Sequence, residues 1–152
     1  MLDLARPHHA HIERRLRTEP IIWLGSTRPD GRPHLVPVWF LWDSNRILIF
    51  SLPRTQKVIN LRNNPSVTLA LDAADQGYDI VRMDGRATLL GTDADIRGSM
   101  PAFAEKYASI ARRWAPEEWA AKFSQAIDIR PTRLQSWMTR PGSPPMRTTI
   151  RF

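Results

Sequence analysis

The sequence predicts a mainly β fold, in which a barrel of about six antiparallel strands is flanked by helices packed outside it. Two observations predict this fold. Short apolar segments separated by tight-turn residues recur between residues 20 and 91, which is typical of strands joined by hairpins. The segment from Arg32 to Trp42 is apolar on both faces, whereas a strand with one face in water would alternate polar residues outward. The outer face of this strand therefore needs cover from a helix or a second subunit.

The N-terminal half predicts one helix followed by a meander of strands. Ile12 and Leu16 lie four positions apart among charged residues, so an amphipathic helix is expected within residues 1–19. Turns are expected at the sequences RPDG and DSN, whose residues favour chain reversal. The strands expected in the meander of residues 20–91 cover residues 20–27, 32–42, 46–51, 66–72 and 78–90, the last one bent near Gly85.

Helical spacing and a second apolar run complete the layout of a single domain over residues 1–152. The helix inside the meander ends at Asn64, because a residue before proline avoids the helical conformation. The remaining elements are a helix over residues 54–63, a helical insert over 92–126 with helices at about 93–112 and 116–125, a last strand over 127–140 and an irregular, proline-rich tail over 141–152.

Composition excludes several classes of protein. The chain has no cysteine, which excludes a disulfide framework, a thiolate metal site and a cysteine nucleophile. It has no run of 18 apolar residues to span a membrane and no apolar secretory signal in residues 1–19, so we expect a cytoplasmic protein. Its 22 Lys and Arg outnumber 15 Asp and Glu, but they are scattered rather than gathered in a stripe. This pattern disfavours a nucleic-acid partner and leaves open an anionic small molecule, an acidic partner or a plain arginine-rich surface.

Sequence motifs for several catalytic sites are absent as well. The chain contains no G-x-G-x-x-G, no P-loop, no G-x-S-x-G and no H-E-x-x-H. The N-terminal histidines do not predict a metal site, because only His8 and His11 share a helix face. His34 stands alone in the second expected strand, and we interpret it as structural.

The segment from Phe50 to Pro65 is the most informative one for function. A strand ends, a short turn follows, and a helix begins with Arg54, Thr55, Gln56 and Lys57. Helix N-termini expose backbone N–H groups and the positive end of the helix dipole, where cations are disfavoured unless an anion compensates them. This segment therefore predicts an anion-binding cradle, although an ordinary basic first turn would give the same pattern.

The segment Trp23–Asp72 resembles the pyridoxamine 5′-phosphate oxidase-like split-barrel superfamily, and within it the branch of deazaflavin (coenzyme F420)-dependent enzymes. The motifs that carry the resemblance are D-G-R-P-H-x-x-P-V-W from Asp30, S-x-P-x-T-x-K from Ser51 and N-L-R-x-N-P from Asn60. The rest of the chain agrees in layout, with D-G-R-A-T-L-L from Asp84, a helical insert and a last strand. The resemblance implies a six-stranded antiparallel split barrel that forms a homodimer, with two cofactor sites at the subunit interface.

The resemblance also implies which residues bind the cofactor. Residues 36–39 would lie along the tricyclic ring, residues 50–51 would border the ring and ribityl chain, and residues 54–57 would hold the phosphate with help from Asn60. Tyr78 and Trp137 would come from the other protomer. The implied cofactor-binding residues are Val36, Pro37, Val38, Trp39, Phe50, Ser51, Arg54, Thr55, Gln56, Lys57, Asn60, Tyr78 and Trp137.

The function implied by the resemblance is an F420-dependent reductase that transfers a hydride between the cofactor and an unidentified small conjugated molecule. No catalytic side chain is assigned, because the cofactor carries the chemistry. FMN is the alternative cofactor. The superfamily's Ser-Arg-Lys phosphate motif reads Thr55-Gln56-Lys57 here, and Gln56 weakens the case for tight FMN binding unless Arg54 compensates. The same fold could also serve a non-catalytic flavin or F420 carrier, or a haem-binding relative, which the lack of a well-placed histidine disfavours.

Overall fold

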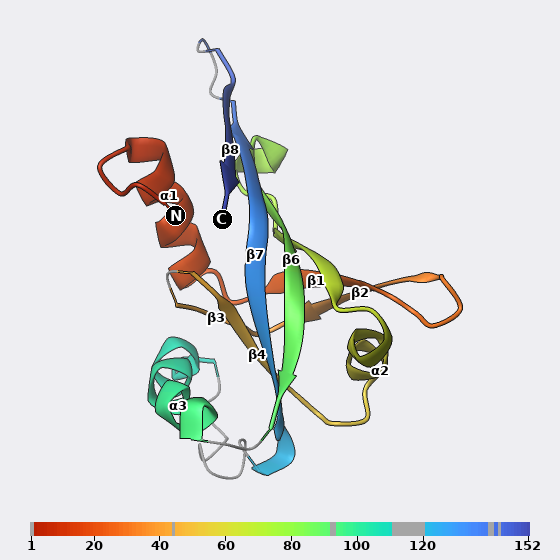
Figure 1. Ribbon diagram of the computed structural model, residues 1–152. Coiled ribbons are helices and arrows are strands. Elements are labelled where there is room, and N and C mark those ends of the chain that lie inside the picture. Colours follow the sequence, from red (N-terminus) through yellow and green to blue (C-terminus); the bar gives the residue numbers. More distant parts are fainter. Residues whose placement is uncertain (1, 44, 92–93, 111–120, 140–141, 143) are drawn as a thin grey trace.

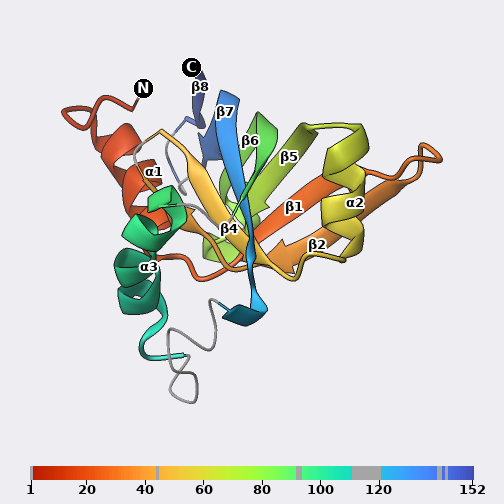
Figure 2. The same cartoon turned by 60° about the horizontal axis from the view of Figure 1, so that its bottom comes forward.

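A curled antiparallel sheet forms the centre of the molecule, with helices on both sides of it (Figures 1 and 2). The computed structural model describes residues 2–43, 45–91, 94–110, 121–139, 142 and 144–152. The strands are β1 (Ile22–Thr27), β2 (Pro33–Val38), β3 (Leu41–Trp42), β4 (Ile47–Ser51), β5 (Ser66–Leu71), β6 (Asp79–Leu90), β7 (Gln125–Met138) and β8 (Met146–Arg151). The helices are α1 (Pro7–Thr18), α2 (Gln56–Asn63) and α3 (Ala94–Tyr107), with a 3₁₀ turn η1 at Asp75–Gly77.

The strands are ordered β2-β1-β5-β6-β7-β4-β3, and β8 pairs with β7 beside this path. The long strands β6 and β7 pair from Asp79–Met138 at one end to Leu90–Ala126 at the other. On the side away from β6, the first residues of β7 pair with β4 and its last residues pair with β8. Gly85 lies at the irregularity of this long hairpin, where a Cβ atom would come within 2.9 Å of the Arg130 carbonyl oxygen. The bend expected near Gly85 therefore has a steric basis.

The hydrophobic core lies inside the curl of the sheet and is closed by α1 and α2. Ile12 and Leu16, the two apolar positions of the predicted first helix, are both fully buried. They join one cluster with side chains of the sheet and of α2, among them Ile22, Leu24, Ile49, Val58, Met83, Ile129 and Leu134. Among the described residues, no helix is long and apolar enough to cross a membrane.

The mainly β fold with flanking helices is confirmed, but the expectation of six strands is wrong. The segment predicted as one strand over residues 32–42 is two strands, β2 and β3, separated at Trp39 and Phe40. Pro33 and Pro37 lack the N–H that a regular ladder needs, and β2, which contains both, lies at one edge of the strand order, whereas β3 lies at the other.

The tail is also more regular than we expected. Residues 146–151 form β8, which pairs with β7 and packs Ile150 against the core. Pro144 and Pro145 precede this strand and leave its hydrogen-bonding residues free of proline. Residues 116–120, the first half of the helix expected at 116–125, lie outside the described residues, as do both ends of the helix expected at 93–112. The expected end of the former helix is wrong, because Gln125 already begins β7.

The two apolar faces of β2 have different surroundings. Val36 and Val38 pack against the core, whereas Leu35 on the opposite face is 62% exposed. No helix of the described chain therefore covers the outer face of β2 at this position.

Helix α1 is fixed to the sheet by a buried ionic cluster around Asp79, which is 4% exposed. His11 Nε2 lies 2.6 Å from Asp79 Oδ2, and Arg15 Nη1 lies 3.0 Å from Asp79 Oδ1. The Arg15 guanidinium also donates to the backbone carbonyls of Asp79 and Asp72, at 2.9 and 2.5 Å. A single carboxylate thus joins the helix to the start of β6.

We expect Asp79→Ala to lower the free energy of unfolding by about 3 kcal/mol, because it removes the buried carboxylate that pairs with Arg15 and His11 and leaves the Arg15 guanidinium with the partly exposed Glu19 as its remaining carboxylate among the described residues. Urea unfolding followed by circular dichroism measures this change. The matched control is Asp30→Ala, whose exposed carboxylate pairs with the exposed Arg32 two residues further on and whose loss should leave stability unchanged. Equal effects of the two substitutions would contradict the role assigned to the cluster.

Candidate functional site

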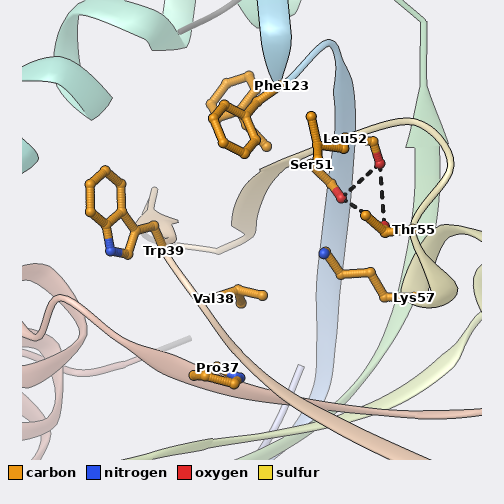
Figure 3. A pocket seen from close by; sticks show the side chains of 9 residues that line it. Pro37, Val38, Trp39, Ser51, Leu52, Thr55, Lys57 and Phe123 are labelled. Atoms are coloured by element: carbon orange, nitrogen blue, oxygen red, sulfur yellow. Dashed lines mark hydrogen bonds between the residues drawn. The ribbon is translucent and has the colours of Figure 1, made fainter. Parts of the chain in front are cut away.

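A pocket of about 410 Å³ opens where the β2–β3 break, the end of β4 and the start of α2 meet (Figure 3). Its volume falls within the range of small-molecule sites in proteins. The residues that line it are Pro37, Val38, Trp39, Phe50, Ser51, Leu52, Thr55, Lys57 and Phe123. Most of this lining is apolar or aromatic, and its polar groups lie together at the β4–α2 side.

The polar side of the pocket is built by the turn between β4 and α2. Ser51 ends β4, and Thr55 is the N-cap of α2 in an extended conformation. The Thr55 side chain does not cap the helix; its hydroxyl instead donates to the Leu52 carbonyl at 3.2 Å and lies 3.0 Å from the Ser51 hydroxyl. The N–H groups of the first helical turn therefore have no capping side chain and are oriented to receive an anion.

Lys57 contributes the positive charge of the pocket. Its ammonium group points into the space between Trp39 and the two hydroxyls (Figure 3). Burial lowers the pKa of Lys57 from its ordinary value of 10.5, and no carboxylate of the described residues opposes this effect. The pKa of His34 is lowered too, first by burial and then by the positive charges of Arg28 and Lys57. The cation is thus partly dehydrated and uncompensated, which is the electrostatic environment of an anion site.

The apolar side of the pocket depends on the break in the edge strand. The ladder between β1 and β2 ends at Ile22–Val38, so Trp39 is free to leave the plane of the sheet. Its indole stacks on the ring of Tyr107 from α3, with 4.4 Å between ring centroids and 7° between ring planes. Phe50, which directly precedes Ser51 in β4, adds a second aromatic wall. A flat aromatic ligand fits such a lining, because rings gain from stacking and from exclusion of water.

The structure brings together seven of the thirteen residues implied by the resemblance, namely Pro37, Val38, Trp39, Phe50, Ser51, Thr55 and Lys57. These residues come from three separate elements, and a single pocket collects them. Arg54 lies next to this set but is exposed and does not line the pocket, whereas Val36 packs against the core.

Gln56 and Asn60 face into the protein rather than into the pocket. Gln56 Nε2 donates to Asn60 Oδ1 at 2.8 Å, and Asn60 Nδ2 donates to the Ser26 hydroxyl at 2.9 Å. Asn60 is fully buried, so its amide fixes α2 to β1. Both residues therefore position the helix that carries Lys57.

Tyr78 and Trp137 lie at the opposite end of the long β6–β7 hairpin. Ser51 pairs with Gln125 at the start of β7, and Trp137 is twelve positions further along the same strand, or about 40 Å away. Trp137 and Tyr78 are 40% and 52% exposed. One chain does not bring them to the pocket, so their contribution from a second protomer stays a prediction.

Two residues of the pocket do not belong to the set expected from the sequence. Leu52 lies inside the S-x-P-x-T-x-K motif and was detectable from its place between Ser51 and Thr55. Phe123 lies near the end of the expected helical insert, more than sixty positions from that motif, and no local pattern marks it. Among the described residues, no group of three His, Asp or Glu side chains is arranged to hold a metal ion.

A family model described as pyridoxamine 5′-phosphate oxidase matches residues 9–138. No curated protein matches the chain. Among solved structures, the chain is similar to an F420 reductase, at 23% identity and a TM-score of 0.64 over 80% of this chain and 94% of that one. A conserved hypothetical protein from Mycobacterium tuberculosis has 23% identity and a TM-score of 0.73, over 90% of this chain and 89% of the other.

Another similar structure belongs to a protein with a different role. HutZ, the heme storage protein from Vibrio cholerae, has 16% identity and a TM-score of 0.65, over 80% of this chain and 88% of that one. At such identities the likeness to solved structures shows the fold alone.

We expect Asn60→Ala to lower the free energy of unfolding by about 2 kcal/mol, because it leaves the buried Ser26 hydroxyl and the Gln56 amide without their partner. Asn63→Ala, an exposed substitution in the same helix, is the control and should change stability by less than about 0.5 kcal/mol. Thermal and urea unfolding measure both. An Asn60→Ala protein as stable as wild type would show that the network does not hold α2.

Proposed function

The chain belongs to the pyridoxamine 5′-phosphate oxidase family, and on that premise we propose that it is an oxidoreductase that binds the deazaflavin F420 in the pocket beside Lys57. The reaction proposed is hydride transfer between this cofactor and a small conjugated molecule. The observation that carries the proposal is the pairing of an aromatic, largely apolar wall with one uncompensated, partly buried cation in the same pocket.

The residues of the pocket fit the two chemical halves of such a cofactor. Trp39 and Phe50 would flank the tricyclic ring, and Lys57 with Thr55 and the first turn of α2 would hold the phosphate. When bound, the deazaflavin supplies a carbon centre that accepts or donates a hydride and reacts poorly with oxygen. The chain's own residues bind and orient it and keep water from one face.

The pocket provides little acid–base chemistry of its own. Among the described residues of the lining, Lys57 alone has an ionisable side chain, and the Ser51 and Thr55 hydroxyls are bonded to each other and to the Leu52 carbonyl. A reaction in which the cofactor carries the electrons needs no acid–base pair from the protein. This property of the lining agrees with hydride transfer and disfavours hydrolysis.

FMN is the second candidate, favoured by the family to which the chain belongs. The position of Gln56 argues against tight FMN binding, because its side chain donates to Asn60 and brings no charge to the phosphate. The similarity to an F420 reductase is in keeping with the deazaflavin. A haem bound through histidine is disfavoured, since the part of the pocket lining that the structure describes contains no histidine.

We further propose that the protein works as a homodimer. Leu35, which is 62% exposed on the outer face of β2, would be covered by a second copy of the chain. In such a dimer, Tyr78 and Trp137 of the second copy would reach the cofactor site. A carrier that binds the cofactor without turnover would use the same pocket, and only an assay with electron acceptors separates the two.

We expect wild-type protein to bind F420 more tightly than FMN, and Lys57→Ala to weaken binding of either by about tenfold or more, through loss of a charged contact to phosphate. Quenching of tryptophan fluorescence during titration measures both affinities. Arg151→Ala removes an exposed cation of β8 and is the control for net charge. Equal losses in the two variants would refute a specific role for Lys57, and tighter binding of FMN would assign the protein to the flavin branch.

The affinity for F420 should also fall as the pH rises into the alkaline range. A bound phosphate raises the lowered pKa of Lys57, so the complex keeps a proton that the free protein loses at high pH. F420 binding is therefore strongest below the pKa that Lys57 has in the free protein, and the affinity falls by up to about tenfold per pH unit above that pKa.

The same titration in Lys57→Ala isolates this effect, because Lys106, with a pKa lowered to about 8, is present in both proteins and contributes equally to them. The slope should be shallower in the variant, because the contribution of Lys57 is missing. A slope as steep in Lys57→Ala as in wild type would contradict the assignment.

A further inference from the structure

Helix α3 supports two walls of the pocket without lining it. Tyr107, 1% exposed, stacks on Trp39, and Phe103, 3% exposed, meets Phe50 edge to face, with 5.0 Å between ring centroids and 87° between ring planes. Phe103 and Tyr107 also contact each other, at 4.7 Å between centroids. The four rings form a continuous row, Trp39–Tyr107–Phe103–Phe50, which we call the aromatic row.

The Tyr107 hydroxyl fixes this row to the break in the edge strand. The backbone N–H of Phe40 donates to the Tyr107 hydroxyl oxygen at 2.8 Å. The hydroxyl hydrogen is shared between the carbonyl oxygens of Pro20 and Phe40, at 2.8 and 2.9 Å. Phe40 lies between β2 and β3, outside the strand ladder, so Tyr107 takes the place of a strand partner.

Lys106 holds the same residue from the adjacent position of α3. Its ammonium group donates to the Phe40 carbonyl at 3.0 Å and lies 3.7 Å from the centroid of the Phe40 ring. The helix therefore binds Phe40 through two neighbouring side chains and binds Trp39 through the stacked ring. Trp39 has little freedom to rotate while these contacts persist.

We propose that Tyr107 is a positioning residue of the candidate site. Its ring fixes the plane of the Trp39 indole, and its contact with Phe103 fixes the distance between Trp39 and Phe50. This inference rests on the proposed function for the identity of the ligand. It assigns to α3 the control of the distance between Trp39 and Phe50, and we call the space between these two rings the ring slot. The row connects both aromatic walls, so displacement of Tyr107 alters the slot but leaves the turn that carries Lys57 and Thr55 in place. Recognition of the ring and recognition of the phosphate are therefore separable.

The test compares Tyr107→Leu, which removes the stacked ring and the hydroxyl, with Tyr107→Phe, which keeps the ring. The probes are F420 and FMN for the whole site and inorganic phosphate for the cradle alone. Tyr107→Leu should weaken binding of the tighter cofactor about tenfold and change the phosphate affinity less than twofold. Tyr107→Phe keeps the stacked ring but loses the hydroxyl bonds to Pro20 and Phe40, so it should weaken cofactor binding less than Tyr107→Leu does, by about threefold, and leave phosphate binding unchanged. Equal losses for cofactor and phosphate in Tyr107→Leu would overturn the inference, as would no loss at all.

A readout without cofactor separates this inference from the proposed function. The accessibility of Trp39 to acrylamide is obtained from the difference in fluorescence quenching between each protein and its version carrying Trp39→Phe. Tyr107→Leu, which loses both the ring and the hydroxyl, should raise this accessibility more than Tyr107→Phe, which keeps the stacked ring. Unchanged quenching in Tyr107→Leu overturns the positioning role whether or not a cofactor binds. If wild type binds neither cofactor, the proposed function fails, and the quenching alone decides the inference.

Two further variants control for stability. Val81→Ala removes buried methyl groups from β6, outside the pocket lining, and should lower stability without changing the ratio of cofactor to phosphate affinity. Phe103→Leu keeps the Trp39–Tyr107 stack but breaks the row, and it carries the test if Tyr107→Leu does not fold. It should weaken cofactor binding about fivefold and leave phosphate binding unchanged, and an unchanged cofactor affinity would contradict the row.

Discussion

The break between β2 and β3 is the constraint on which the rest of the site depends. Pro37 cannot donate a ladder hydrogen bond, and the edge strand stops one residue later at Val38. The backbone of Phe40 is then paired by side chains of α3 instead of by a strand, which turns Trp39 out of the sheet. Without this break the tryptophan would remain in the ladder, and the space beside Lys57 would lack its aromatic wall.

The site combines two independently built halves. The polar half comes from a local segment, the turn between β4 and α2, whose geometry is held by the Asn60 network beneath the helix. The aromatic half comes from distant segments that meet only in the folded chain, since the four strands β3 to β6 lie between Trp39 and Tyr107 in the sequence. Burial of Lys57 joins the halves electrostatically, because the apolar wall removes water from the ammonium group and raises the benefit of a bound anion.

The sequence predicted what local patterns determine. Alternating apolar residues and turn residues located most strands, and the basic helix start located the residues that form the polar half of the pocket. The strand count was wrong because the break at Trp39–Phe40 depends on Tyr107, 67 residues away from Phe40, and no local pattern reveals it. Strand β8 was missed because prolines directly before it suggested an irregular tail. Gln56 was expected to help hold the phosphate together with its neighbours, although it departs from the family motif, and only the structure shows that its amide turns toward Asn60.

The most direct test of this account is a crystal structure of the protein with F420 bound. The account predicts the tricyclic ring beside Trp39 and Phe50, with a phosphate oxygen within hydrogen-bonding distance of Lys57 Nζ. A ring bound elsewhere on the chain, or a phosphate that contacts neither Lys57 nor the start of α2, would contradict it.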